Sequence, residues 1–124
     1  MTSLPQVAQR SRDGDCVRLT LNVTADLAAF EGHFPGTPIL PAVVQVDWAV
    51  RFARDAFDLP AHFHALRALK FLAVVQPPVD LMLDLARDAA GRSVAFTYLR
   101  AGFACSSGRI EFADDAPGPD RSVL

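Results

Sequence analysis

A histidine in a constrained segment is a residue that could move a proton. Gly32 precedes His33 and Pro35 follows it closely, so the backbone around the imidazole has few conformations open to it. An unperturbed histidine has a pKa of about 6.5, which lets it accept a proton near neutral pH. His33 is therefore a candidate general base, and a structural histidine bonded to carbonyls of its own loop is the alternative.

Asp47 is the second candidate, because it lies in a stretch that is otherwise largely apolar. A helix that begins near Pro41 would place it about two turns from the helix start. Burying an ionised carboxylate without a partner is costly, so we expect Asp47 to keep its proton and to act as general acid beside His33. The alternative is a structural carboxylate bonded to Gln45, Trp48 or an arginine of another element.

The start of the same helix supplies a third group, the backbone amides of Ala42, Val43 and Val44. The first N–H groups of a helix have no acceptor within the helix and lie at the positive end of its dipole. Such donors can hold a developing oxyanion, like the enolate that forms when a proton leaves the carbon next to a thioester carbonyl. Base, acid and donors together predict an elimination next to an activated carbonyl, and amides capped by water or a side chain are the alternative.

Hydrophobic periodicity predicts the elements that position these groups. Residues 17–23 alternate apolar and polar side chains, which predicts a strand with one face in the core. Residues 5–10 are predicted to pair with it across a turn at residues 12–15. Residues 24–41 hold too many glycines and prolines for a long regular element, so we expect an ordered loop that leads into the helix.

Pro41 is expected to be the first helical residue, and the helix is predicted to continue from Ala42 to about Phe57. Its first half is apolar on nearly every side, so we expect that half to be buried all round. The chain is expected to form one α+β domain over residues 1–124, with the helix on one face of an antiparallel sheet and a frayed tail at 114–124. Four further strands are predicted, at residues 65–75, 79–86, 93–99 and 102–112.

Composition limits the partners and the compartment. Of the 124 residues 51% are apolar, so we expect apolar surface that another subunit covers in a dimer or higher oligomer. A net charge of −2 gives no basic field for nucleic acid, and we expect neither a secretory signal nor a membrane span. The widely spaced Cys16 and Cys105 fit a reducing cytoplasm.

His62 and His64 share a strand face but lack a third ligand at a useful spacing, so we expect no metal site.

The run from Phe30 to Asp47 resembles the signature of the bacterial 3-hydroxyacyl-acyl-carrier-protein dehydratases of hotdog fold. That family has a Gly-His-Phe-Pro loop, two apolar residues bracketed by prolines, and a helix with a carboxylate at this spacing. Lys70, Phe71 and residues 77–80 also resemble its third strand and the following turn, so the likeness covers most of the chain. It implies an antiparallel sheet wrapped around one long central helix.

The resemblance also implies a role for each site residue. His33 would take the C2 proton, Asp47 of the partner subunit would protonate the departing 3-hydroxyl group, and the Ile39 carbonyl would steady the imidazole. The Ala42 and Val43 amides would hold the thioester oxygen. The implied enzyme is a homodimer with two sites at its interface, needs no metal or organic cofactor, and acts on chains that acyl carrier protein carries.

Three residues depart from the family pattern. Ala42 replaces a glycine, which adds a methyl group near the thioester and bears on the geometry of the amide donor. Asp47 resembles the branch that makes and isomerises unsaturated chains, whereas the long-chain dehydratases carry glutamate there. Arg51 replaces a glutamine, and an arginine that points at Asp47 would weaken its role as a general acid.

The run from Gln45 to Ala49 is most similar to dehydratases of aryl polyene and related polyketide-type gene clusters. The implied substrate is an aryl-terminated 3-hydroxyacyl or polyenoyl chain. We expect Phe34 and Trp48 to bind it, with Phe52 and Phe57 also available to line an apolar tunnel. Ordinary core positions are the alternative for these aromatic residues.

Two other functions stay open at this point. A non-catalytic hotdog subunit, which binds acyl chains or supports a paralogous dehydratase in a heterodimer, is favoured by Ala42 and Arg51. A hotdog acyl thioesterase is the other, and the Gly-His-Phe-Pro loop argues against it.

Four basic residues allow two interpretations, a basic patch that binds the acidic carrier protein or scattered solvated charges. They are Arg51, Arg54, Arg67 and Lys70.

Overall fold

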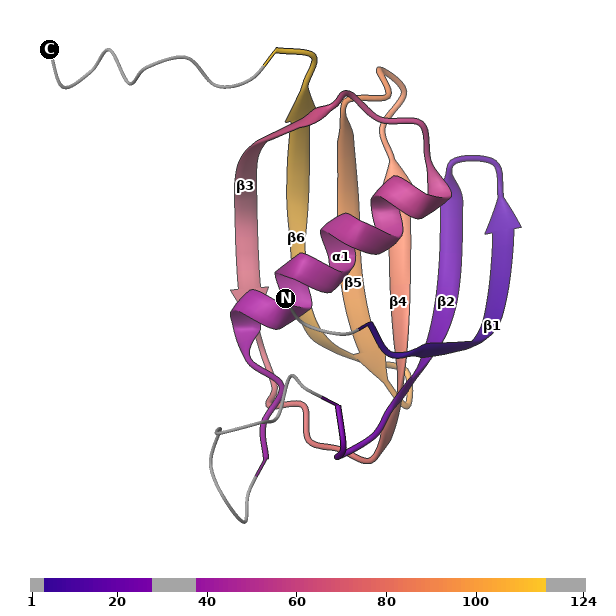
Figure 1. The fold of residues 1–124 in the computed structure, drawn as a ribbon, viewed down its shortest axis with the longest axis vertical. Helices are drawn as coiled ribbons and strands as arrows, with labels where there is room; N and C mark the ends of the chain where they lie inside the picture. Colours follow the sequence, from indigo (N-terminus) through magenta and orange to yellow (C-terminus); the bar gives the residue numbers. More distant parts are fainter. Residues whose placement is uncertain (1–3, 28–37, 116–124) are drawn as a thin grey trace, which may run out of the picture.

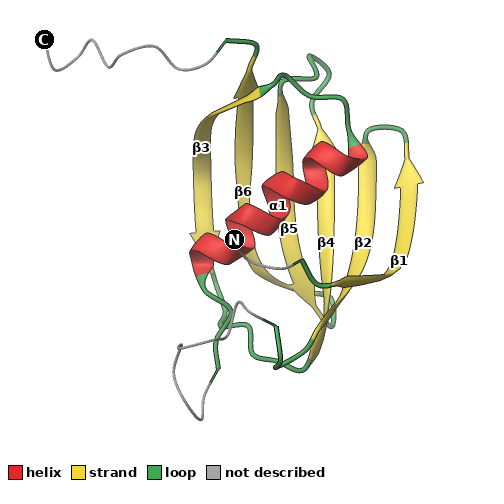
Figure 2. Cartoon of the chain, in the orientation of Figure 1, coloured by secondary structure: helices red, strands yellow, loops and turns green. Residues whose placement is uncertain are grey.

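The computed structural model describes residues 4–27 and 38–115. Its strands form one antiparallel six-stranded sheet in the order β1-β2-β4-β5-β6-β3. The helix crosses one face of this sheet (Figure 1 and Figure 2), so the predicted α+β arrangement is confirmed. The elements are β1 (Gln6–Asp13), β2 (Cys16–Val23), α1 (Ala42–Ala56), β3 (His62–Phe71), β4 (Val79–Arg87), β5 (Ser93–Arg100) and β6 (Phe103–Ala113).

Alternation along β2 sends one face of the sheet into the core. Val17, Leu19 and Leu21 are at most 3% exposed, whereas Arg18 between them faces outward. The predicted pairing with the preceding segment is confirmed as the β1–β2 hairpin. Gly14 in its turn has a φ of 59°, a conformation that glycine adopts without strain.

The inner face of the sheet packs against α1 and forms the hydrophobic core. The helix contributes its largest apolar side chains to this contact, and the central strands contribute every second residue. The buried set includes Trp48, Ala49, Phe52 and Ala53 of α1, Leu81, Leu83 and Leu85 of β4, Val94, Phe96 and Tyr98 of β5, and Ile110 and Phe112 of β6.

The helix begins one residue later than the sequence predicted. Pro41 is its cap, in an extended conformation with φ −62° and ψ 148°, and Ala42 is the first helical residue. At the other end, the Arg12 guanidinium donates a hydrogen bond of 2.6 Å to the Ala56 carbonyl. A cation at this end complements the negative end of the helix dipole.

The strand predicted at residues 65–75 runs instead from His62 to Phe71, so its predicted end was wrong. The backbone after β3 instead binds the segment before the helix, because the Val75 carbonyl accepts a 2.8 Å hydrogen bond from the Leu40 amide. An apolar run does not reveal where a strand leaves its sheet. The strands predicted at 79–86, 93–99 and 102–112 are confirmed within one residue at each end.

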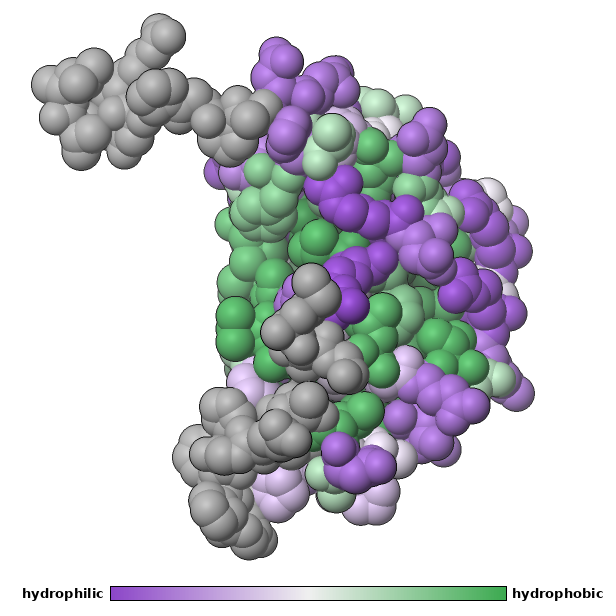
Figure 3. Space-filling view, in the orientation of Figure 1, coloured by the Kyte–Doolittle hydropathy of each residue, from purple (hydrophilic) through white to green (hydrophobic). Residues whose placement is uncertain are grey.

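The first half of α1 is not buried all round in the single chain, contrary to the prediction. Val43 is 74% exposed, because the sheet covers only one side of the helix. Exposed apolar side chains continue along β3, where Phe63, Leu69 and Phe71 are 40–45% exposed. Figure 3 shows this region as a green area over β3. We call these four residues the apolar edge.

Gly108 of β6 leaves room for two apolar side chains. A Cβ atom there would lie 2.7 Å from Cε2 of Phe96 and 2.8 Å from Cδ2 of Leu69. Phe96 is fully enclosed in the core, so its ring has little freedom to move away. We expect Gly108→Ala to lower the free energy of unfolding by about 1–3 kcal/mol, as measured by urea titration.

Gly91→Ala is the matched control for that measurement. Nothing lies within 4 Å of its Cβ position, and only its φ of 73° opposes a side chain. Its cost should be nearer to about 1 kcal/mol. A Gly108→Ala variant that unfolds at the same urea concentration as the unmodified protein would show that the core repacks around the extra methyl group.

Candidate active site

The start of α1 presents amide donors that no described residue uses. The Val44 and Gln45 amides both donate to the Pro41 carbonyl, at 3.1 Å each. The Ala42 and Val43 amides have no acceptor within residues 4–27 and 38–115. The first turn carries no acidic side chain, and the cap makes no side-chain hydrogen bond. Among the described residues, nothing competes with an oxyanion for these two donors at the positive end of the helix dipole.

Asp47 follows these donors on the exposed side of α1. Its side chain is 44% exposed in the single chain, so the expectation that it is buried among apolar groups was wrong here. Nη1 of Arg51 lies 3.5 Å from Oδ2 of Asp47, one helical turn along. Arg51 therefore points at Asp47, which is the orientation that would weaken Asp47 as a general acid. An ion pair this exposed contributes little to stability.

Tyr98 of β5 lies fully buried beneath this part of the helix. Its hydroxyl donates a 2.7 Å hydrogen bond to the Gln45 carbonyl. Burial raises the pKa of Tyr98 well above its ordinary value, and the nearby charge of Asp47 raises it further. The phenol therefore stays protonated, and remains a donor, throughout the pH range in which a histidine titrates.

Gln45 is the residue of this site whose contacts the sequence did not predict. It is 3% exposed, its Nε2 donates to the Leu40 carbonyl at 3.1 Å, and its Oε1 accepts from the Ser106 hydroxyl at 2.7 Å. From the sequence it was only one possible partner of Asp47. The available signal was a single amide in an apolar stretch, which marks a buried polar group that must find partners.

The remaining predicted site residues fall into two groups. His33 and Phe34 lie outside the described residues, so their roles stay predictions. Ile39 is half-buried and directly precedes Leu40. Trp48 is fully buried, and its indole N–H has no partner among the described residues. Phe52 and Phe57 pack in the same core, and a tunnel along these aromatic residues also stays a prediction.

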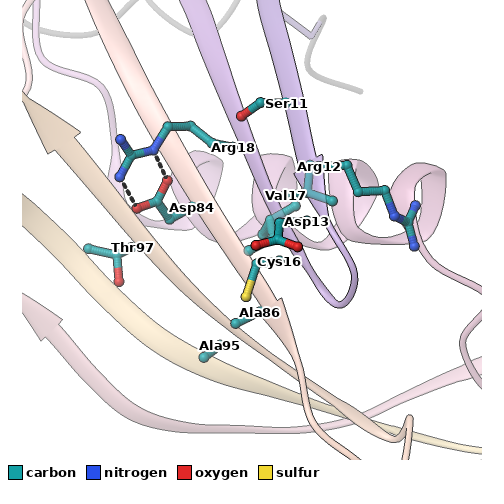
Figure 4. A pocket seen from close by; sticks show the side chains of 11 residues that line it. Ser11, Arg12, Asp13, Cys16, Val17, Arg18, Asp84, Ala86, Ala95 and Thr97 are labelled. Atoms are coloured by element: carbon teal, nitrogen blue, oxygen red, sulfur yellow. Dashed lines mark hydrogen bonds and ion pairs between the residues drawn. The ribbon is translucent and has the colours of Figure 1, made fainter.

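A separate cleft of about 490 Å³ opens on the outer face of the sheet, opposite α1. Figure 4 shows Arg18 and Asp84 inside it, joined by hydrogen bonds of 2.6 and 2.7 Å, with Cys16 and Thr97 nearby. Among the described residues that line it, none belongs to the predicted site. The cleft is therefore distinct from the helix start.

The described part of the chain forms no metal cluster and no membrane-spanning helix. Across 4–27 and 38–115, no three His, Cys, Asp or Glu side chains cluster in a way that could hold a metal ion. The two histidines considered from the sequence, His62 and His64, are exposed on β3. In the same stretches, no helix has the length and apolar character that crossing a membrane requires. Of the tail expected to be frayed, residues 116–124 lie outside the described residues.

Comparison with known proteins places the chain in a family. The family model for ApeI-like proteins, described as ApeI dehydratase, matches residues 9–109. The 3-hydroxyacyl-[acyl-carrier-protein] dehydratase FabZ of Ligilactobacillus salivarius is 31% identical over 97 residues, which cover 69% of either chain. FabZ of Lactobacillus helveticus is 26% identical over 121 residues, which cover 89% of this chain and 80% of the relative.

Solved structures of dehydratases also resemble this chain. The dehydratase heterocomplex ApeI:P from Xenorhabdus doucetiae aligns with a TM-score of 0.81 and 27% identity, over 88% of this chain and 97% of that chain. The dehydratase domain of the CurK module of curacin polyketide synthase aligns with a TM-score of 0.63 at 12% identity, over 98% of this chain and 46% of that one, which supports the fold alone. The hotdog fold and the dehydratase resemblance are both confirmed. The chain belongs to the family of ApeI-like dehydratases.

Proposed function

We propose that this dehydratase converts 3-hydroxyacyl-acyl-carrier-protein thioesters to trans-2-enoyl thioesters and water, in fatty acid or aryl polyene biosynthesis. The observation that carries the proposal is α1, which begins with two amide donors that have no acceptor among the described residues and carries the Asp47 carboxyl on its exposed side. The FabZ relatives, which are named as dehydratases of this substrate class, support it. A cytoplasmic location belongs to the same proposal.

The proposed reaction moves one proton to a base and one from an acid. His33, held by the Ile39 carbonyl, removes the proton from C2, and the enolate oxygen accepts hydrogen bonds from the Ala42 and Val43 amides. The electron pair then forms the C2–C3 double bond. The 3-hydroxyl group leaves with the proton of Asp47 of the partner subunit and is released as water. The proton on His33 exchanges with solvent, and Asp47 regains one, which restores the starting state.

The active form in this proposal is a homodimer that acts on acyl carrier protein. The apolar edge runs along β3, which is an edge strand of the sheet and has backbone groups free to pair with another strand. A second copy joined there would cover the exposed side of α1 that carries Asp47. Twofold symmetry would then build two identical sites per dimer.

Mass spectrometry of acyl carrier protein tests the function. Carrier protein loaded with alkyl or aryl-terminated 3-hydroxyacyl chains is incubated with the purified protein, and the loss of one water from the chain is the expected result. An unchanged chain in every case would overturn the proposal. Release of free thiol would identify a thioesterase instead, and the relative yields of alkyl and aryl products would define the substrate.

The ion pair between Arg51 and Asp47 favours one other function, a non-catalytic subunit in a heterodimer. A guanidinium stabilises the charged form of a carboxyl, which cannot act as an acid. The solved relative ApeI:P is a dehydratase heterocomplex. If this chain has the same kind of role, it will be inactive alone and will contribute to turnover only when a paralogous dehydratase is added.

Replacing Arg51 by glutamine is a direct test of that ion pair. Arg51→Gln removes the cation beside Asp47, and we expect kcat to rise by up to about 3-fold, a modest change because the pair is well solvated. Steady-state kinetics on the carrier-protein substrate provides the measurement. Arg54→Gln is the control, since Arg54 lies on the same helix but bonds to the Pro60 and Ala61 carbonyls. A large fall in kcat for Arg51→Gln alone would mean that Arg51 assists turnover.

A further inference from the structure

We infer that Gln45 is a positioning residue, whose buried side chain fixes the backbone from Ile39 to Val43 and thereby aims the groups that hold the thioester and the imidazole. Its effect on catalysis rests on the proposed function. Its effect on the backbone rests on contacts within the described residues alone.

The start of α1 lacks the usual means of fixing a helix terminus. Its cap residue is Pro41, which has no side-chain donor or acceptor and makes no capping hydrogen bond. Gln45 supplies a substitute, because its side chain reaches back along the chain to the Leu40 carbonyl, at 3.1 Å. A carbonyl can only accept, so the atom of Gln45 that faces it must be the Nε2 donor.

The other groups of Gln45 are held by the sheet. Its Oε1 accepts from the Ser106 hydroxyl of β6 at 2.7 Å, and its main-chain carbonyl accepts from the Tyr98 hydroxyl of β5, also at 2.7 Å. All three residues are 3% exposed or less. Water does not replace a lost partner at such a depth, so each of these bonds has a defined geometry that is costly to give up.

The backbone at Leu40 is consequently held on both sides. Its amide, which shares a peptide unit with the Ile39 carbonyl, donates to the Val75 carbonyl at 2.8 Å. Its own carbonyl lies in the next peptide unit and accepts from Gln45, and the amide of Ala42 lies in the unit after that. Loss of the Gln45 bond would let the middle unit rotate, which would change the position of the imidazole support relative to the oxyanion donors.

Two substitutions of Gln45 separate positioning from a merely structural role. Gln45→Leu removes both side-chain bonds, and we expect kcat to fall by about 10- to 100-fold with little change in KM. Gln45→Glu retains the shape, but only its protonated form can donate to Leu40. The ratio of its kcat to that of the unmodified enzyme should therefore rise as the pH falls, because buried carboxyls take up a proton readily. Taking the ratio at each pH removes the pH dependence that the two enzymes share.

Two controls accompany these variants. Ser106→Ala removes only the bond to β6 and leaves the donor on Leu40, so its loss of kcat should be much smaller than that of Gln45→Leu. Val94→Ala weakens the core at the start of β5, four residues before Tyr98, and controls for a general loss of stability. A Gln45→Glu ratio that is flat with pH, or a Gln45→Leu variant with unchanged kcat, would overturn the inference.

Hydrogen exchange tests the same inference without any substrate. The hydrogen-bonded amides of Leu40, Val44 and Gln45, followed by mass spectrometry, should exchange about 10-fold faster in Gln45→Leu than in the unmodified protein or in Val94→Ala, because local opening becomes easier. Equal exchange in all three proteins would overturn the positioning role. If the unmodified protein fails to dehydrate any substrate, the proposed function fails, and the exchange experiment still decides whether Gln45 holds this segment.

Discussion

Replacing His33 by alanine, or Asp47 by asparagine, is expected to lower kcat by about 10²- to 10⁴-fold, because each change removes one of the two groups that move protons. The kcat of the double variant should be only slightly lower than that of the less active single variant, since a base and an acid that act together have non-additive effects. Steady-state kinetics with carrier-protein substrates provides the measurement. Circular dichroism and sedimentation must first show that each variant keeps the fold and the oligomeric state.

Mixing these two variants tests whether each site draws on both subunits. A heterodimer of His33→Ala and Asp47→Asn chains would contain one site with both substitutions and one site with neither. Random exchange of subunits would then restore about a quarter of the unmodified activity, from half of the dimers with one intact site each. Activity that stays at the level of the single variants would place His33 and Asp47 of one site in the same chain.

Most of the sheet could be predicted from the sequence because its residues obey one rule. In β2, for example, Leu19 and Leu21 alternate with polar neighbours, and a period of two defines both the strand and its buried face. β3 does not obey that rule. Its register shifts between Arg67 and Lys70, and Ala68 within it has a φ of 55°. At this irregularity the side chains stop alternating between the two faces of the sheet, so a period of two does not describe the whole strand.

The positions of the candidate groups on the helix were predictable from local sequence, whereas their packing was not. Asp47 and the amides of Ala42 and Val43 follow from their places in a short stretch of helix. The exposure of Asp47 in the single chain could not be read from that stretch, because an apolar helix start is equally compatible with burial by the sheet or by a second subunit. One of the two side-chain hydrogen bonds of Gln45 is to Ser106, which is 61 residues away in the sequence, so local sequence could not reveal it.

Replacing Phe71 by glutamate is expected to weaken the proposed dimer strongly. Phe71 pairs with Ser106 across β3 and β6, and Ser106 bonds to the helix, so both side chains lie on the helix face of the sheet. In the single chain Phe71 is nonetheless 45% exposed. A charge placed where a second subunit packs would be buried without a partner, so we expect the dimer dissociation constant to rise at least about 100-fold, as measured by analytical ultracentrifugation.

Met82→Glu adds the same charge on the opposite face of the sheet and is the control for that experiment. Met82 pairs with Thr20 and lies outside the apolar edge, so this variant should remain dimeric and active. If the site needs two subunits, the activity per chain of Phe71→Glu should fall at low protein concentration and recover at high concentration, where mass action restores the dimer. A Phe71→Glu variant that is fully dimeric and active would exclude the β3 edge as the joint, and the other free edge of the sheet, β1, would have to be tested in its place.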